Sequence, residues 1–222
     1  MFRPFLLATA LFALPAYALD QLNQVDFSAE VTREVGNDLM AAHLSADISD
    51  RQAAQVSAQL NGVLNAALHR AEDFPSIHLS SGSQTTFPIY GKNNQPTGWR
   101  GHGELLLETH DFKSASDLIA RIQDSVQLSS VTFSISPDAY RRIQNEMIVE
   151  GMAEFRKRAK VIVDAMNGRG YRIVHLNIEQ GYATPAPLMA RMADSAPVAP
   201  DFSPGVTPLT LRISGTIEVQ EH

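Results

Sequence analysis

Apolar residues recur at every fourth position between residues 136 and 170, which predicts one long helix. The stretch begins with Ser136 and Pro137, residue types that cap and start helices. Its apolar ridge consists of Ile143, Met147, Gly151, Phe155, Ala159 and Val163. The helix would be roughly 45 Å long, so we expect it either to extend beyond its own core or to line a partner subunit. Gly168 and Gly170 are candidates for the left-handed residue that ends it.

Alternating apolar and polar residues predict strands before and after this helix. Residues 25–35 and 39–48 alternate in this way, and the turn formers Gly36, Asn37 and Asp38 between them predict an antiparallel hairpin. A second hairpin is predicted from two longer alternating stretches joined by a polar loop. The remaining predicted strands, including those of the second hairpin, are residues 77–90, 99–110, 126–136, 171–181 and 209–219.

Two shorter helices complete the pattern, at residues 51–72 and 114–125, each with apolar positions three and four residues apart. Together the elements predict an α+β fold: an antiparallel or mixed sheet of about seven strands, covered by two shorter helices and one long helix. Residues 183–208 contain six of the twelve prolines and six alanines, which predicts a flexible loop without regular structure.

The first eighteen residues have the pattern of a secretory signal peptide. Arg3 precedes an apolar run, and Ala16 and Ala18 are small residues of the kind that signal peptidase needs. We therefore expect export to the periplasm and a mature chain that begins at Leu19, without a membrane span. Because Arg3 leaves with the signal peptide, the formal charge changes from −6 to −7. We therefore expect no nucleic-acid partner.

No familiar catalytic pattern is present. The chain has no cysteine, which excludes thiol catalysis and cysteine-ligated metals. Gly98, Gly101 and Gly103 resemble a phosphate-binding loop, but they lead into a predicted strand and not into a helix. His102 and His110 would stand roughly 26 Å apart on one strand, too far for a shared metal. We predict no catalytic, cofactor or metal residues; a Ser-His-Asp triad assembled from distant residues is an open alternative.

The order of these elements resembles the SIMPL-domain family. The residues that carry the resemblance are FSISPDAYRRIQNEMIVEGMAEFRKRAKVIVDAM, the following YRIVHLNIE, Pro204 with Gly205, and the terminal LTLRISGTIEV. The family comprises exported bacterial proteins, among them periplasmic immunogenic proteins and oxidative-stress-defence proteins. The resemblance covers about residues 25–219, which makes residues 19–222 one SIMPL-like domain. It implies a sheet covered by helices, export to the periplasm or outer surface, and homo-oligomers, and it brings no catalytic residues.

These observations lead to a functional expectation. We expect a non-enzymatic envelope protein that acts through homo-oligomeric assembly or binding, connected with oxidative or envelope stress tolerance and peripherally associated with the envelope. The candidate oligomer contact consists of Phe155, Arg156, Lys157, Arg158 and Lys160. Glu146 and Glu150 are candidates for pairing with a neighbouring subunit. The alternative is a periplasmic small-molecule or peptide binder, or a hydrolase of unrecognised type, with a pocket near Trp99 and Tyr182.

Overall fold

The computed structural model describes residues 23–181 and 202–221. The predicted signal peptide and most of the Pro/Ala-rich loop lie outside this range. The α+β class is confirmed, with seven strands and three helices in the predicted order. The elements are β1 (Gln24–Gly36), β2 (Leu39–Asp50), α1 (Ala53–Ala71), β3 (Ile77–Tyr90), β4 (Pro96–Thr109), α2 (Phe112–Ile122), β5 (Gln127–Ser134), α3 (Pro137–Ala165), β6 (Gly170–Gly181) and β7 (Val206–Gln220).

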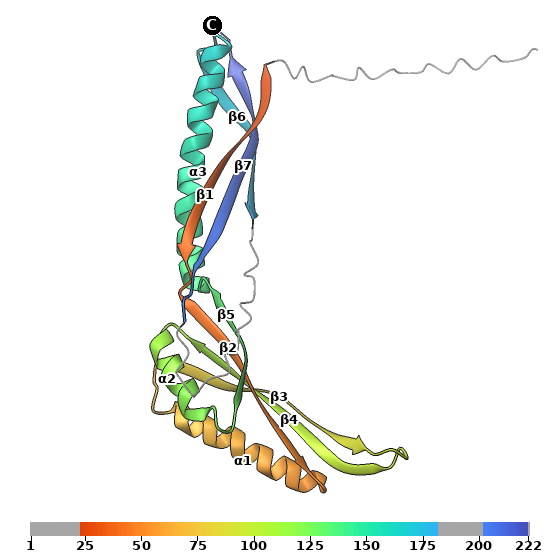
Figure 1. Cartoon of the computed structure of the whole chain (residues 1–222). Helices are drawn as coiled ribbons and strands as arrows, with labels where there is room; N and C mark the ends of the chain where they lie inside the picture. The colour runs from red at the N-terminus through yellow and green to blue at the C-terminus, as the bar shows by residue number, and fades with distance from the viewer. Residues whose placement is uncertain (1–22, 182–201, 222) are drawn as a thin grey trace, which may run out of the picture.

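The seven strands form two antiparallel sheets. One has the order β1-β7-β6 and the other β3-β4-β2-β5. α3 covers one face of the first sheet, whereas α1 and α2 cover one face of the second, and the two assemblies are joined end to end (Figure 1). We call them the α3 layer and the α1 layer. Each has its own cluster of buried apolar residues.

The predicted hairpin between the first two strands is wrong. β1 pairs with β7, from Gln24 opposite Glu218 to Gly36 opposite Val206, whereas β2 lies between β4 and β5. Turn formers indicate that the chain changes direction but do not determine which strands pair. The second predicted hairpin, β3 with β4, is confirmed.

The long helix matches the length of its own sheet. α3 has 29 residues and β7 has 15, which correspond to about 44 Å of helix and about 50 Å of strand. Buried residues occur along the whole helix, from Ala139 to Val163. The expectation that α3 extends beyond its own core is therefore corrected, because long strands cover its apolar ridge from end to end.

Both ends of α3 are defined by local hydrogen bonds. The Ser136 hydroxyl accepts from the amide of Ala139 at 3.3 Å, and Pro137 is the first helical residue, as predicted. At the other end Asn167 has a φ of 57° and, with Gly168, donates to the last turn. Asn167, and not a glycine, is thus the left-handed residue of a Schellman motif.

Close packing in the α3 layer depends on a glycine. The ring of Phe155 is fully buried and stacks on Phe27 of β1 at 4.3 Å between centroids. A Cβ atom on Gly215 would lie 3.3 Å from the Phe155 ring and 2.4 Å from the carbonyl oxygen of His175. Gly215 therefore allows β7 to approach both β6 and the Phe155 ring.

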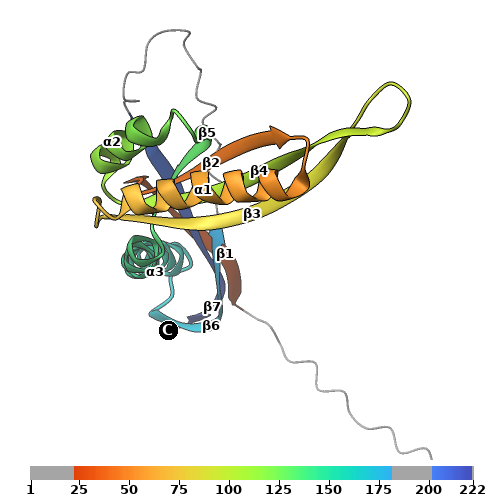
Figure 2. The same ribbon diagram turned by 90° about the horizontal axis from the view of Figure 1, so that it is seen from below.

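Glycines have the same role in the α1 layer. Gly101 and Gly103 lie on β4 beneath α1, and a Cβ atom at either would come within 3 Å of Val56 or Leu64 of that helix. These glycines, which superficially resemble a phosphate-binding loop, form the surface on which α1 packs. Beyond the N-terminal end of α1, the β3–β4 hairpin continues into solvent as a projecting arm (Figure 2).

The two layers meet at a polar junction. The side-chain amide of Asn37 donates to the carbonyl of Pro204 at 2.7 Å, and its carbonyl oxygen accepts from Thr207 at 2.7 Å. Just before this point Phe202 lies against Phe133 of the α1 layer, with 6.0 Å between ring centroids. The chain thus crosses between layers beside the point where β1 leads into β2.

Candidate functional site

The flank of α3 beside β6 is partly apolar, half-buried at Tyr140, Ile148 and Met152 and exposed at Arg156 and Lys160. Tyr140 and Gln144 line a small hollow together with Gly181 at the end of β6. Positions four residues apart share one flank of a helix. The same flank therefore continues through Ile148, Met152, Arg156 and Lys160.

β6 adds apolar side chains at the edge of the sheet. Among the described strands it pairs only with β7, so its other edge is open. Ile173, Val174 and Ile178 are 36%, 47% and 41% exposed. An edge strand with exposed aliphatic side chains is a surface on which another strand or subunit can pack. We call Ile173, Val174, Ile178, Arg156 and Lys160 the β6 surface.

The structure separates the five predicted contact residues. Phe155 is completely buried in the core of its own protomer and is thus not available to a partner. The expected contact therefore does not include it. Its place in the four-residue ridge is a sign of packing against the protomer's own sheet, and not of an interface.

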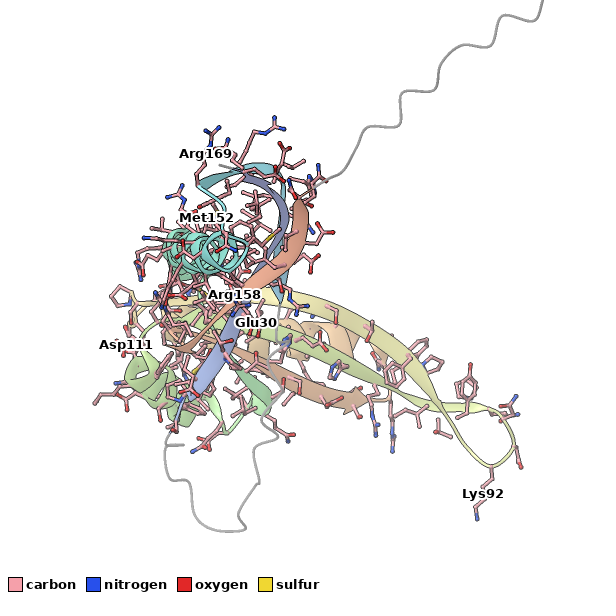
Figure 3. The ribbon with its side chains drawn as sticks, turned by 90° about the horizontal axis from the view of Figure 1, so that it is seen from above. Glu30, Lys92, Asp111, Met152, Arg158 and Arg169 are labelled. Carbon is pink, nitrogen blue, oxygen red and sulfur yellow. The ribbon has the colours of Figure 1, made fainter. Side chains whose placement is uncertain are left out.

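The four cations are exposed but face different surroundings. Arg156 and Lys160 lie on the flank beside β6. Lys157 lies 3.7 Å from Glu154 within the helix. Arg158 donates to the carbonyl of Ser28 on β1, on the opposite flank (Figure 3). Of the predicted contact residues, Arg156 and Lys160 remain together as a candidate pair.

Glu146 and Glu150 have a partner within the same chain. Arg33 of β1 donates to Glu146 at 2.7 Å and to Glu150 at 2.9 Å. The hydrogen bonds to Glu146 and then Glu150 raise the pKa of Arg33. Pairing of these carboxylates across subunits, as the sequence suggested, is corrected: they hold β1 against α3.

A row of polar side chains crosses the uncovered face of the second sheet. Ser83 donates to Glu104 at 2.7 Å, and the ring nitrogens of His102 lie 3.5 Å from Glu104 and 3.3 Å from Asp47. The Ser83 hydroxyl, followed by His102, lowers the pKa of Glu104. Because the hydroxyl donates to a carboxylate and not to the imidazole, this arrangement lacks the hydrogen bond of a nucleophilic triad.

Metal ligands do not converge in the described part of the chain. Within residues 23–181 and 202–221, no group of three His, Asp or Glu side chains is placed to hold a metal ion. His102 lies opposite Asp47 on the neighbouring strand, as expected of a cross-strand histidine.

A hollow on the uncovered face of the α3 layer has a volume of about 480 Å³. It is lined by Asp26, Phe27, Ser28, His175, Asn177, Ser214, Gly215 and Thr216. Sequence reasoning missed it, because its side chains come from three strands that are distant in the chain. The alternative pocket proposed near Trp99 and Tyr182 cannot be placed, since Tyr182 lies outside the described residues.

A family model described as SIMPL, protein of unknown function (DUF541), matches residues 25–220. The chain belongs to the SIMPL family. This confirms the resemblance found from the sequence over nearly the whole chain. No curated protein matches the SIMPL chain.

Two solved structures resemble part of the SIMPL chain. AtUAH in complex with glyoxylate is 17% identical, with a TM-score of 0.29 over 46% of this chain and 28% of its own. A hydantoinase/carbamoylase family amidase from Burkholderia ambifaria is 16% identical, with a TM-score of 0.22 over 45% and 28%. The SIMPL chain thus matches under a third of the length of each, and neither likeness bears on its function.

Within residues 23–181 and 202–221, the SIMPL protein has no helix that is both long and apolar enough to cross a bilayer.

Proposed function

We propose that this SIMPL protein is an exported, non-enzymatic envelope protein that acts through homo-oligomeric assembly. The observation that carries the proposal is the open edge of β6, where Ile173, Val174 and Ile178 are exposed beside the α3 flank. Each aliphatic side chain that becomes fully buried contributes up to about 2 kcal/mol. A second copy that packs on this edge would cover the apolar side chains and the open backbone groups together.

Charges on the same flank support a specific contact. Arg156 and Lys160 are exposed on the α3 flank beside the apolar edge. Charged residues around an apolar centre favour correct partners and disfavour others. The assembly should therefore weaken as salt rises, because the exposed charges are screened.

The test is the solution mass of residues 19–222, measured by light scattering after gel filtration over a wide range of protein concentration. We expect a mass several times that of the protomer. Substituting Ile173 and Ile178 together with serine should lower that mass. Val206→Ser is the matched control, because Val206 is 58% exposed but lies at the start of β7.

Charge reversal on the α3 flank beside β6 provides a second test of the same proposal. Arg156→Glu together with Lys160→Glu should weaken assembly, whereas Lys113→Glu on α2, at a side chain 87% exposed, should leave it unchanged. A wild-type protein that stays monomeric at every concentration overturns the proposal.

Export and stress tolerance belong to the same proposal and rest on the N-terminal sequence and the family resemblance. N-terminal sequencing of periplasmic protein should give Leu19 as the first residue. Cells that lack the protein should tolerate peroxide or detergent less well, and the Ile173/Ile178 serine variant should fail to restore growth. Full rescue by a monomeric variant would separate stress tolerance from assembly.

A further inference from the structure

The outer part of the β3–β4 hairpin projects beyond α1 and lies apart from the β6 surface (Figure 2). Gln84 donates a hydrogen bond to Asn61 of α1 at 2.9 Å, and a Cβ atom on Gly101, opposite Thr86, would still meet Val56 of that helix. Farther out the hairpin is no longer covered by a helix (Figure 2). We call residues 85–100 the arm. Its tip is closed by two backbone hydrogen bonds, from Gly91 to Gln95 at 2.9 Å and from Asn94 to Gly91 at 3.1 Å. The arm is therefore an ordered projection with a defined end.

The arm is unusual in its charge. The chain has 24 acidic residues, yet none occurs in residues 74–103, where Lys92 and Arg100 are the Lys and Arg residues. Phe87 and Tyr90 are 44% and 57% exposed on the arm. A cationic projection with exposed aromatic rings on an acidic protein has the composition of a binding element.

The uncovered face of the α3 layer has the opposite charge. The strand register places five carboxylates and two guanidinium groups on this face, for a formal charge of −3. The carboxylates belong to Asp26, Glu30, Glu34, Glu179 and Glu218, and the guanidinium groups to Arg172 and Arg212. The hollow of about 480 Å³ lies on the same face, where Asp26 accepts from the Thr216 hydroxyl.

The polar lining of this hollow fits the polar tip of the arm. Ser28, Asn177 and Ser214 line it with hydroxyl and amide groups. The tip carries Lys92 and the amides of Asn93 and Asn94. Ammonium and amide donors on a convex tip match carboxylate and hydroxyl acceptors in a concave face.

We propose that the arm of one copy docks by its tip on the uncovered β1-β7-β6 face of a second copy, with Lys92 beside Asp26. Within one protomer Lys92 lies at the far end of the arm, away from Glu30 on that face, so the contact is intermolecular (Figure 3). The inference rests on the proposed assembly but uses residues other than those of the β6 surface. Because arm and face differ, the contact is head-to-tail and propagates from copy to copy.

A lipid surface is the weaker candidate for the arm. Two cations are few for binding to anionic lipid, which generally uses four or more. The polar residues at the tip, Lys92 to Gln95, would also have to enter the bilayer before Phe87 or Tyr90 reached it.

The test uses the chain's single tryptophan. Trp99 is half-buried at the base of the arm, opposite Asp50 of β2, so its fluorescence reports on the environment of the arm near the α1 layer. As wild-type residues 19–222 are concentrated, the emission should move to shorter wavelength while the mass rises. Lys92→Glu and Asp26→Lys should each raise the concentration needed for association about tenfold. Lys113→Glu, the same charge change on α2, should have no effect.

Mixing the two variants tests whether Lys92 of one copy pairs with Asp26 of another. Lys92→Glu protein retains the acidic face, and Asp26→Lys protein retains the cationic arm, so the mixture should associate where neither variant does alone. Wild-type assembly that Lys92→Glu leaves unaltered overturns the arm proposal and leaves the β6 surface standing. A monomeric wild type overturns the proposed function itself. The vesicles to be tested are of zwitterionic lipid in one sample and of anionic phosphatidylglycerol in another. An emission shift with either, without self-association, would assign the arm to lipid and overturn the contact proposed here.

Discussion

The carboxylate of Asp38 accepts two hydrogen bonds from Ser136, one from the backbone amide at 2.6 Å and one from the hydroxyl at 2.8 Å. Ser136 also caps α3, so the junction between β1 and β2 is bonded directly to the start of the long helix. Burial by itself raises the pKa of Asp38. The hydrogen bonds from the Ser136 amide and hydroxyl lower it, and the net pKa lies below the ordinary value.

Asp38→Ala should reduce the free energy of unfolding by about 1 to 2 kcal/mol near neutral pH, since two charge-assisted hydrogen bonds at a partly exposed site are lost. The measurement is urea denaturation. Because folding depresses the pKa of Asp38, its contribution is complete above the unfolded-state pKa of about 3.9 and disappears as the pH falls through the lower, folded-state value. The difference between variant and wild type should therefore shrink in acid. Asp124→Ala, at an exposed position on the α1 layer, should change stability by less than about 0.5 kcal/mol.

Two glycine-to-alanine changes should have opposite effects. Gly215→Ala places a Cβ atom 2.4 Å from the backbone oxygen of His175, which cannot move without shifting β6. We expect a loss of about 2 to 3 kcal/mol. Gly62→Ala in α1 meets no atom within 4 Å and should gain up to about 1 kcal/mol from helix propensity. Thermal unfolding measures both, and equal effects of the two substitutions would contradict the packing described.

Phe155 should behave as a core residue and not as a contact residue. Phe155→Ala should destabilise the protein by about 3 to 5 kcal/mol, because a fully buried ring is removed. Combined with Phe27→Ala, a double-mutant cycle should show a coupling of about 0.5 to 1.5 kcal/mol for the stacked pair. Arg156→Glu is the surface comparison on the same helix and should leave stability within about 0.5 kcal/mol. A stable Phe155→Ala protein that only loses assembly would contradict this assignment.

The pKa of Glu104 should respond to Ser83. The Ser83 hydroxyl is the largest cause of the lowered pKa, with His102 second. Ser83→Ala should therefore raise the pKa of Glu104 toward the ordinary value of about 4.3, as measured by NMR titration of the side-chain carboxyl carbon. Ser80→Ala is the control, because Ser80 donates to the backbone oxygen of Leu106 instead. An unchanged Glu104 pKa in Ser83→Ala would show that the 2.7 Å hydrogen bond does not form in solution.

Local patterns were sufficient to predict each helix and strand. Alternation identified the strands, and Ser136 with Pro137 marked the start of α3 correctly. Pairing was harder, because it joins residues that are distant in the chain. Val31 lies opposite Leu211, and no signal near either residue indicates this. The turn between β1 and β2 therefore suggested a local hairpin that does not form.

The candidate surfaces were only partly predictable for the same reason. The four-residue ridge showed that Phe155 is apolar, but the length of β1 and β7 decides that it is covered by its own chain. Arg156 and Lys160 could be predicted to be exposed, because each lies one position after a residue of the apolar ridge of α3. The open edge of β6 and the acidic face opposite α3 could not, since both depend on which strands are neighbours.

The order of strands has a consequence for how the polypeptide is made. β1 is the first described strand and its partner β7 is the last, while the whole sheet from β2 to β5 is encoded between them. Because a chain is synthesised from its N-terminus, the β3-β4-β2-β5 sheet is complete before β7 is made. Until then β1 has no partner strand and is exposed to aggregation and to chaperones. Premature termination before β7, which has 15 residues, would leave the β3-β4-β2-β5 sheet intact. It would remove the central strand of the sheet on which α3 packs.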